Sequence, residues 1–324
     1  MTTPISASLV KELRDKTGAG MMDCKTALTE NKGDIEQAVD WLRKKGLSKA
    51  ANKAGRIAAE GLIGVTSKDK TGAMVEVNSE TDFVARNERF QDMVRTIASL
   101  APKADGDLEK LLGFAYPGKS MTVADYVKEM VATIGENMSV RRTVAMAVGD
   151  GHVAEYVHNK VADGLGKIGV LVALESKGDK AEVARFGKQL CLHIAAASPL
   201  AIAAADLDPK LIERERAVYI EQAKASGKSA EIAAKMVEGR LRKEFFQQVV
   251  LLQQTFLGAG GDGKATVQQV LEAAEKTAGA PIKIAKFARY ALGEGIDRKD
   301  GDFASEVAKA AGRGGSGAGA QIGQ

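Results

Sequence analysis

Apolar residues recur at helical spacing through the first 46 residues. The segments SLVKELRDKT, MMDCKTALTENKG and DIEQAVDWLRKKG are separated by the glycines of TGAG and by Gly33. In the third segment Asp34 is a good N-cap, with Gln37 three residues later. Each segment places apolar side chains on one face, as Leu9, Val10 and Leu13 do in the first. The pattern predicts a small three-helix module over residues 1–46.

A strand-and-helix pattern follows and then returns. GLIGVTS and GAMVEVN predict a hairpin around KDKTG, and FQDMVRTIASLAP predicts a helix whose inner face begins at Phe90. A shift of 97 positions carries Gly72 to Gly169, Val75 to Val172, Ile97 to Ile194 and Pro102 to Pro199. The earlier strand matches AEYVHNK at a shift of 95. This favours two related halves, residues 58–145 and residues 146–205 with 246–297, although chance similarity of amphipathic segments stays open.

The remaining segments complete a mixed α+β fold. TVADYVKEMVATIGEN predicts a helix, and MSVRRTVAMAV and IKIAKFARYAL predict strands. DPKLIERERAVYIEQAKAS and SAEIAAKMVEGRLRKEFFQQVVLLQQTFL are long charged helical patterns that meet at Gly227, which predicts a projecting hairpin over residues 206–245. DFASEVAKAA predicts a short C-terminal helix within 298–312, and residues 313–324 form a Gly-rich tail that we expect to be disordered.

Composition narrows the class of protein. Hydrophobic residues make up 45% and charged residues 27% of the 324 residues, which is typical of a globular protein. Two distant cysteines, Cys24 and Cys191, indicate no disulfide framework and favour a reducing, cytoplasmic compartment. We see no signal peptide and no apolar run long enough to span a membrane.

One short region is strongly basic. Six basic residues and no acidic residue lie between Arg43 and Ala59, around the predicted linker 47–57. A solvated linker is the simpler interpretation. The alternative is an RNA-binding accessory module that uses this linker with Arg141 and Arg142. The net charge of +4 is small for this length and does not imply a general nucleic-acid binder.

Motifs for enzyme chemistry are weak. GAGGDGKAT, Gly258 to Thr266, approaches a phosphate-binding loop, and Lys264 fits, but Ala265 replaces the hydroxyl residue that would reach Mg²⁺. GLGKIG precedes a strand instead of opening a helix, so we interpret it as a turn. No metal site or nucleophilic triad is predicted, and the histidines show no ligand spacing: His152, His158 and His193. We therefore expect no covalent catalysis, no cofactor and no metal.

Two features suggest contact with a partner. Met21 and Met22 follow a glycine turn near Arg14, although both could fill the core of the module. In NSETDFVARNERF, Phe83 stands ahead of the apolar face that begins at Phe90. Phe83 could be a hydrophobic staple at the start of the helix. Its counterpart in the second half is Lys180, which argues against a need for an aromatic residue in the scaffold.

These features carry a family resemblance over nearly the whole chain. SLVKELRDKTGAGMMDCKTAL, NSETDFVAR, IGENMSVRR, KMVEGRLRK and GEGID occur in this order, and the chain resembles the elongation factor Ts family. The resemblance implies an N-terminal module like a ubiquitin-associated (UBA) domain, a pseudo-symmetric two-part core, a helical hairpin and a C-terminal helix. It also implies a cytoplasmic, non-enzymatic guanine-nucleotide exchange factor for the GTPase elongation factor Tu, with no membrane or specific nucleic acid as partner.

The resemblance also assigns roles to residues. Asp82 and Phe83, with Thr81 and Val84 beside them, would intrude between helices of the GTPase and disturb its Mg²⁺ and phosphate site. Arg14, Met21 and Met22 would hold the nucleotide domain, and Phe303 and Val307 would add a further contact. A homodimer or a 2:2 complex through the hairpin arm stays open. The loop HNKVADGLGKIG is longer than is usual in the family, so contacts around His158 are uncertain.

Overall fold

The computed structural model describes residues 5–225, 230–258 and 263–297. Its first three helices pack around one apolar cluster that includes Leu13, Cys24 and Leu28. The predicted module ends at Gly46, but the third helix continues to Ala51, because Leu, Lys and Ala in LSKAA all favour helix. The first five residues of the predicted linker 47–57 are therefore helical. The helices are α1 (Ala7–Thr17), α2 (Met21–Glu30) and α3 (Ile35–Ala51).

A four-stranded antiparallel sheet follows, in the order β3-β2-β1-β5. β1 and β2 form the predicted hairpin, and helices α4 and α6 contribute to the core on one side of this sheet. The fourth strand is short and comes from the loop after β4, so it crosses the predicted boundary between the halves. The elements are β1 (Glu60–Lys68), β2 (Thr71–Ser79), α4 (Glu88–Leu100), α5 (Leu108–Gly113), α6 (Val123–Ile134), β3 (Met138–Ala147) and β5 (Leu165–Gly166).

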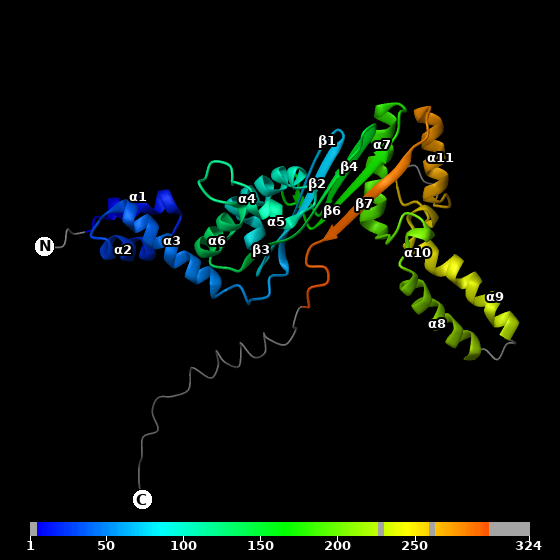
Figure 1. Ribbon diagram of the computed structural model, residues 1–324, viewed down its shortest axis with the longest axis horizontal. Helices are drawn as coiled ribbons and strands as arrows, with labels where there is room; N and C mark the ends of the chain where they lie inside the picture. Colours follow the sequence, from blue (N-terminus) through cyan, green and yellow to red (C-terminus); the bar gives the residue numbers. More distant parts are fainter. Residues whose placement is uncertain (1–4, 226–229, 259–262, 298–324) are drawn as a thin grey trace, which may run out of the picture.

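A second antiparallel sheet has three strands, in the order β4-β6-β7. Its core is formed with α7 and α11, and the predicted late strand is its last member, β7. Figure 1 shows these two helices alongside the sheet. The elements are β4 (Gly151–His158), β6 (Ile168–Glu175), α7 (Lys180–Ala197), α11 (Val267–Ala278) and β7 (Lys283–Ala291).

Residues from both sheets share a further apolar cluster, and two glycines allow the close approach. A Cβ atom on Gly169 would lie 2.5 Å from Met74 Sδ and 2.6 Å from Ile63 Cγ2 of the first sheet. A Cβ atom on Gly72 would lie 2.7 Å from Val153 Cγ1 of the second sheet. The shift of 97 positions matches these two glycines to each other. Each meets the opposite sheet, which gives a physical reason for glycine at both positions.

Two helices project from the sheets (Figure 1). They are α8 (Pro209–Ala225) and α9 (Ala230–Arg240), and they share a cluster that includes Tyr219, Val237 and Leu241. The long helical pattern predicted after α9 is wrong beyond this point. The chain forms a π-helix over Leu241–Phe246, a short α10 (Gln247–Val249) and a 3-10 turn at Leu251–Gln253. Pairing of Val250 with Ala201 outweighs the local helical preference. In the described part of the chain, no helix is long and apolar enough to cross a membrane.

Candidate functional site

The predicted contact residue Phe83 lies in the short connection between β2 and α4. Its side chain is 75% exposed, whereas Phe90, seven residues later, is fully buried. Asn87 caps α4, because its Oδ1 accepts hydrogen bonds from the backbone N–H groups of Arg89 (3.0 Å) and Phe90 (3.3 Å). A hydrophobic staple would occupy the position before this cap, which is Arg86. The staple interpretation of Phe83 is therefore excluded.

The backbone around Phe83 is held in one conformation. Val84–Arg86 form a 3-10 turn. The N–H groups of Ala85 and Arg86 donate to the carbonyls of Asp82 (3.2 Å) and Phe83 (3.1 Å). Val84 and Ala85 are buried and anchor the turn in the core, so Val84 does not present a surface of its own. Asp82 and Phe83 before the turn are both exposed, and we call these two residues the tip.

The preceding residue, Thr81, is fixed by a carboxylate from a distant part of the sequence. Glu136 accepts hydrogen bonds from the Thr81 backbone N–H (2.9 Å) and from Thr81 Oγ1 (2.6 Å). Ser79 Oγ also donates to the Thr81 carbonyl oxygen at 3.0 Å. Sequence reasoning missed Glu136, because it lies 55 residues after Thr81 and no local pattern links the two positions.

The predicted N-terminal contact residues are also exposed. Met21 is 51% exposed and Met22 is 72% exposed, while the core of the module is built from other residues. The alternative that both methionines fill this core is therefore excluded. Arg14 is exposed on α1 as well. Their role in binding a partner stays a prediction, and the predicted C-terminal helix 298–312, with Phe303 and Val307, and the tail 313–324 lie outside the described residues.

A groove lies between the end of α1 and the start of α4. Arg14 of α1 and Gly18, which follows this helix, line one side, and Asn87 and Arg89 at the start of α4 line the other. Arg89 lies so close to Gly18 that a Cβ atom there would overlap Arg89 Nη1. The structure thus places Arg14 across from the helix cap that stands directly behind the tip.

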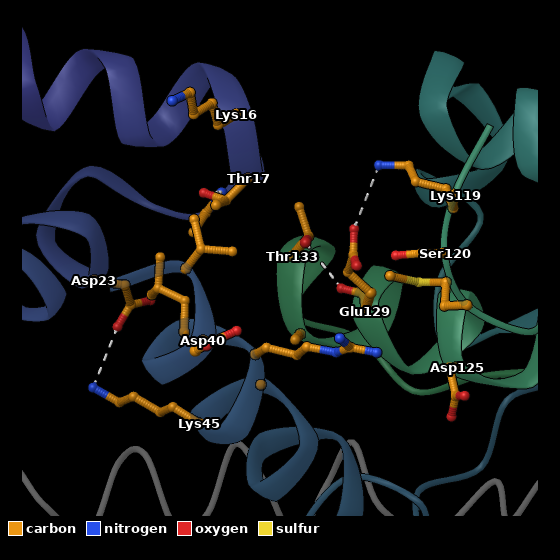
Figure 2. A pocket seen from close by; sticks show the side chains of 17 residues that line it. Lys16, Thr17, Asp23, Asp40, Lys45, Lys119, Ser120, Asp125, Glu129 and Thr133 are labelled. Carbon is orange, nitrogen blue, oxygen red and sulfur yellow. Dashed lines mark hydrogen bonds and ion pairs between the residues drawn. The ribbon is translucent and has the colours of Figure 1, made fainter. Parts of the chain in front are cut away.

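A second cavity, of about 380 Å³, separates the N-terminal helices from α6 (Figure 2). Its charged side chains balance, with Lys45 paired to Asp23 (3.6 Å) on the side of the N-terminal helices and Lys119 paired to Glu129 (3.9 Å) on the side of α6. Four basic and four acidic residues line it, so it has no charge preference: Lys16, Arg43, Lys45, Lys119, Asp23, Asp40, Asp125 and Glu129. It is a cleft between the module and the sheet region.

Four of the basic residues considered for RNA binding are engaged within the chain. Lys53 donates to the Gly135 carbonyl oxygen, and Arg56 pairs with Glu80 at 3.5 Å. Arg141 and Arg142 both pair with Glu76, which is fully buried. These contacts favour a structural role for the four basic side chains.

The buried carboxylate of Glu76 is stabilised in its charged form. Burial raises the pKa of this group, but hydrogen bonds from the Gly293 N–H, Asn78 and Arg142 outweigh that effect and hold the pKa below its usual value. Arg141 Nη2 also donates to the Glu294 carbonyl oxygen at 2.7 Å. This cluster fastens the end of β7 to β2, the strand that leads to the tip.

The weaker motifs have structural explanations. Gly164 has a φ of 71° in a tight turn closed by the Ala162–Leu165 bridge, as expected for a turn. A phosphate-binding loop follows a buried strand. The segment before Gly258 instead contains a 3-10 turn at Leu251–Gln253, which argues against such a loop. His193 is packed inside, as predicted. Both cysteines are free and buried. Among the described residues, no cluster of three or more His, Cys, Asp or Glu could hold a metal ion.

Together these features define a class of protein. It has a mixed α+β fold, an aromatic tip held in a fixed conformation, and a second exposed surface on neighbouring helices. Preformed exposed anchors of this kind are typical of proteins that act through contact with another macromolecule.

Comparison with known proteins identifies the family. The family model described as elongation factor TS matches residues 80–294. Elongation factor Ts of Parvibaculum lavamentivorans is 60% identical over 307 residues, covering 95% of this chain and 98% of the relative. Elongation factor Ts of Rhodospirillum centenum is 56% identical over 308 residues, covering 95% and 99%. The chain belongs to the elongation factor Ts family of translation elongation factors.

Proposed function

We propose that this protein is a cytoplasmic guanine-nucleotide exchange factor. It binds elongation factor Tu in the GDP form, accelerates the loss of GDP and leaves when GTP binds. Membership of the elongation factor Ts family supports this proposal. The observation that carries it is Phe83, which is 75% exposed on a turn whose backbone is already fixed. The factor forms no covalent bond with nucleotide and needs no cofactor of its own.

The tip acts as an apolar wedge. Mg²⁺ and the amides around the phosphates supply much of the hold of a GTPase on its nucleotide. Insertion of Phe83 between two packed helices forces a discrete shift of those helices and disturbs this site. Burying a Phe side chain stabilises the shifted state by about 1.5–3 kcal/mol. By linkage, the factor weakens GDP binding by the same ratio by which GDP weakens binding of the factor.

The other parts of the chain supply further contacts. The N-terminal module, which we propose to be UBA-like, holds the nucleotide domain through Arg14, Met21 and Met22. Phe303 and Val307 add a contact near the C-terminus. The two sheet regions are pseudo-symmetric halves in this proposal, and the hairpin arm 206–245 is the surface for a homodimer or a 2:2 complex.

Release of fluorescent GDP from elongation factor Tu tests the proposal. Excess unlabelled nucleotide is added with increasing amounts of wild-type factor, Phe83→Ala or Leu257→Ala. Leu257 is a matched control, because it is an exposed apolar residue (61%) on a different part of the fold. We expect the wild type and the control to accelerate release. Phe83→Ala should reduce the maximal rate by about 10- to 100-fold, the factor that corresponds to losing one buried phenyl group.

Two outcomes would contradict this proposal. If wild-type factor does not accelerate GDP release at any concentration, the exchange function is wrong. If Phe83→Ala accelerates release as well as the wild type, the wedge mechanism is wrong and another surface carries the exchange.

A further inference from the structure

The turn after α6, Gly135–Asn137, receives contacts from two distant segments. On one side, Glu136 holds Thr81 and the Asn137 backbone N–H donates to Glu80 Oε1 at 2.5 Å. On the other side, Lys53 donates to the Gly135 carbonyl oxygen. Asn137 Nδ2 donates to the Arg56 carbonyl oxygen at 2.7 Å. All three residues of the turn therefore bind other segments.

The contact with Glu136 fixes the orientation of Thr81 as well as its position. One carboxylate oxygen accepts from the Thr81 backbone N–H and the other accepts from its side chain, so neither the peptide plane between Glu80 and Thr81 nor the Thr81 side chain can rotate freely. Both bonds involve a charged acceptor, and such bonds are shorter and stronger than neutral ones. Only Asp82 lies between Thr81 and Phe83. The orientation of the tip therefore depends on Glu136.

The same turn is connected to the N-terminal helices. Gly46 of α3 lies so close to α6 that a Cβ atom there would be 2.9 Å from Ala132 Cβ. Lys53 and Arg56 follow α3 directly. Lys53 reaches the C-cap of α6, where a cation is favoured by the helix dipole. Arg56 also pairs with Glu80, so the segment after α3 contacts both the turn and a residue two positions before the tip.

We propose that Glu136 is a positioning residue for nucleotide exchange. It sets the orientation of Asp82 and Phe83 through Thr81, and the turn around it joins that orientation to the N-terminal helices through Lys53 and Arg56. This inference rests on the proposed exchange function. Glu136 acts through the tip and has no contact with nucleotide in this mechanism. A poorly oriented tip still permits binding through the other surfaces, but it lowers the yield of productive insertion.

The GDP-release assay tests this inference when it separates maximal rate from half-saturating concentration. The variants are Glu136→Ala, Glu136→Gln and Thr81→Val, with Glu129→Ala as the matched control. Glu129 is a carboxylate on α6, the helix that precedes the turn, and it pairs with Lys119. Wild type in the same assay establishes whether exchange occurs. Thermal melting of each variant establishes that it is folded.

We expect Glu136→Ala to lower the maximal release rate about tenfold, with less than a twofold change in half-saturating concentration. Glu136→Gln should recover most of the rate, because the amide oxygen still accepts from the Thr81 N–H and the amide N–H₂ can donate to Thr81 Oγ1. Thr81→Val should also lower the maximal rate. The double variant with Glu136→Ala should lower it by less than the product of the two single fold-changes, because both substitutions remove the same contact. Glu129→Ala should match the wild type.

Several results would overturn the inference. An unchanged maximal rate in folded Glu136→Ala, or a change confined to half-saturation, would show that Glu136 does not position the tip, while the exchange function would stand. If Glu136→Ala does not fold, Glu136→Gln and Thr81→Val decide: wild-type rates in both refute the positioning role. If the wild-type factor does not accelerate GDP release from elongation factor Tu, the proposed exchange function itself is wrong.

Discussion

At the scale of single residues, two phenylalanines have opposite environments: Phe83, which precedes α4, and Phe90, in its first turn. Phe83 is 75% exposed and Phe90 is fully buried, although both occur in NSETDFVARNERF. A shift of 97 positions matches Phe83 to Lys180, and this polar counterpart favoured exposure of Phe83 in the sequence analysis. The Glu136 contact could not be predicted in the same way, since it joins positions 55 residues apart.

Stability measurements on the two phenylalanines follow from this difference. We expect Phe83→Ala to change the free energy of unfolding by only about 0.5 kcal/mol, as is usual for surface substitutions. Phe90→Ala removes a buried ring and should cost about 3–5 kcal/mol. Urea denaturation of both variants and the wild type measures the two values. A large loss of stability in Phe83→Ala would mean that its ring is packed in solution.

The buried ring of His193 predicts that the free energy of unfolding depends on pH. The Leu257 N–H donates to His193 Nδ1 at 3.1 Å, so the ring proton lies on Nε2, 2.9 Å from Gln254 Oε1. Burial lowers the pKa of His193, and the Gln254 hydrogen bond, which raises it, does not compensate. The folded chain therefore takes up a proton at lower pH than the unfolded chain. Stability from this residue is complete above the unfolded pKa and falls as pH decreases from about 6.5.

Thermal or urea denaturation between pH 7.5 and 5.5 checks this expectation. The contribution of His193 to the slope should not exceed about 1.4 kcal/mol per pH unit, the limit for one proton. His193→Gln should remove that part of the slope, and the control His158→Gln, at an exposed position, should retain it. Equal slopes in the wild type and His193→Gln would contradict the assignment of a neutral, buried ring.

At the scale of elements, the projecting helices α8 and α9 have an apolar cluster of their own. Leu241 is 1% exposed within this cluster, next in sequence to the end of α9. The amphipathic pattern predicted both helices, but it did not predict the π-helix and the extended Val250 that follow. Those features depend on pairing with Ala201, which is distant in the sequence.

We expect Leu241→Ala to loosen the projecting helices selectively. Removing a buried Leu side chain costs about 2–5 kcal/mol, and the loss should fall on the local cluster. Hydrogen exchange read by mass spectrometry should show faster exchange in α8 and α9, with β6 little changed. Ile232→Ala, at a 51% exposed position of α9, is the control and should leave exchange unaltered. Equal acceleration in β6 would show that the projecting helices and the sheets unfold as one unit.

At the scale of the whole molecule, the two sheets depend on each other through a tightly packed boundary. Helices and strands with a regular apolar period were predictable from the sequence, as α4, α6 and β7 show. The grouping of strands into sheets was less predictable, because β5 follows β4 in sequence but pairs with β1 of the other sheet. A two-residue strand has no periodicity that could indicate its partner.

The glycine at position 169 provides a test of this boundary. Gly169→Ala would bring a methyl group against Met74 and Ile63, and such overpacking typically costs about 1–3 kcal/mol. Gly239→Ala is the control, because a Cβ atom there meets nothing within 4 Å and Ala favours the helix. We expect a lower melting temperature for the first variant and an equal or higher one for the second. Equal melting temperatures would mean that the sheets separate more easily than their packing indicates.

The pairing of β5 with β1 also has a consequence for the growing chain on the ribosome. Gly64 finds its partner Leu165 only after 101 further positions have been added. Until then Ile63 and Gly64 at the centre of β1 have no strand partner on that side, and an unpaired strand edge is a template for association with other chains. A nascent chain of this protein therefore passes through an interval in which the centre of β1 is unpaired on one side, and that interval lasts at least until residues 165–166 have been synthesised.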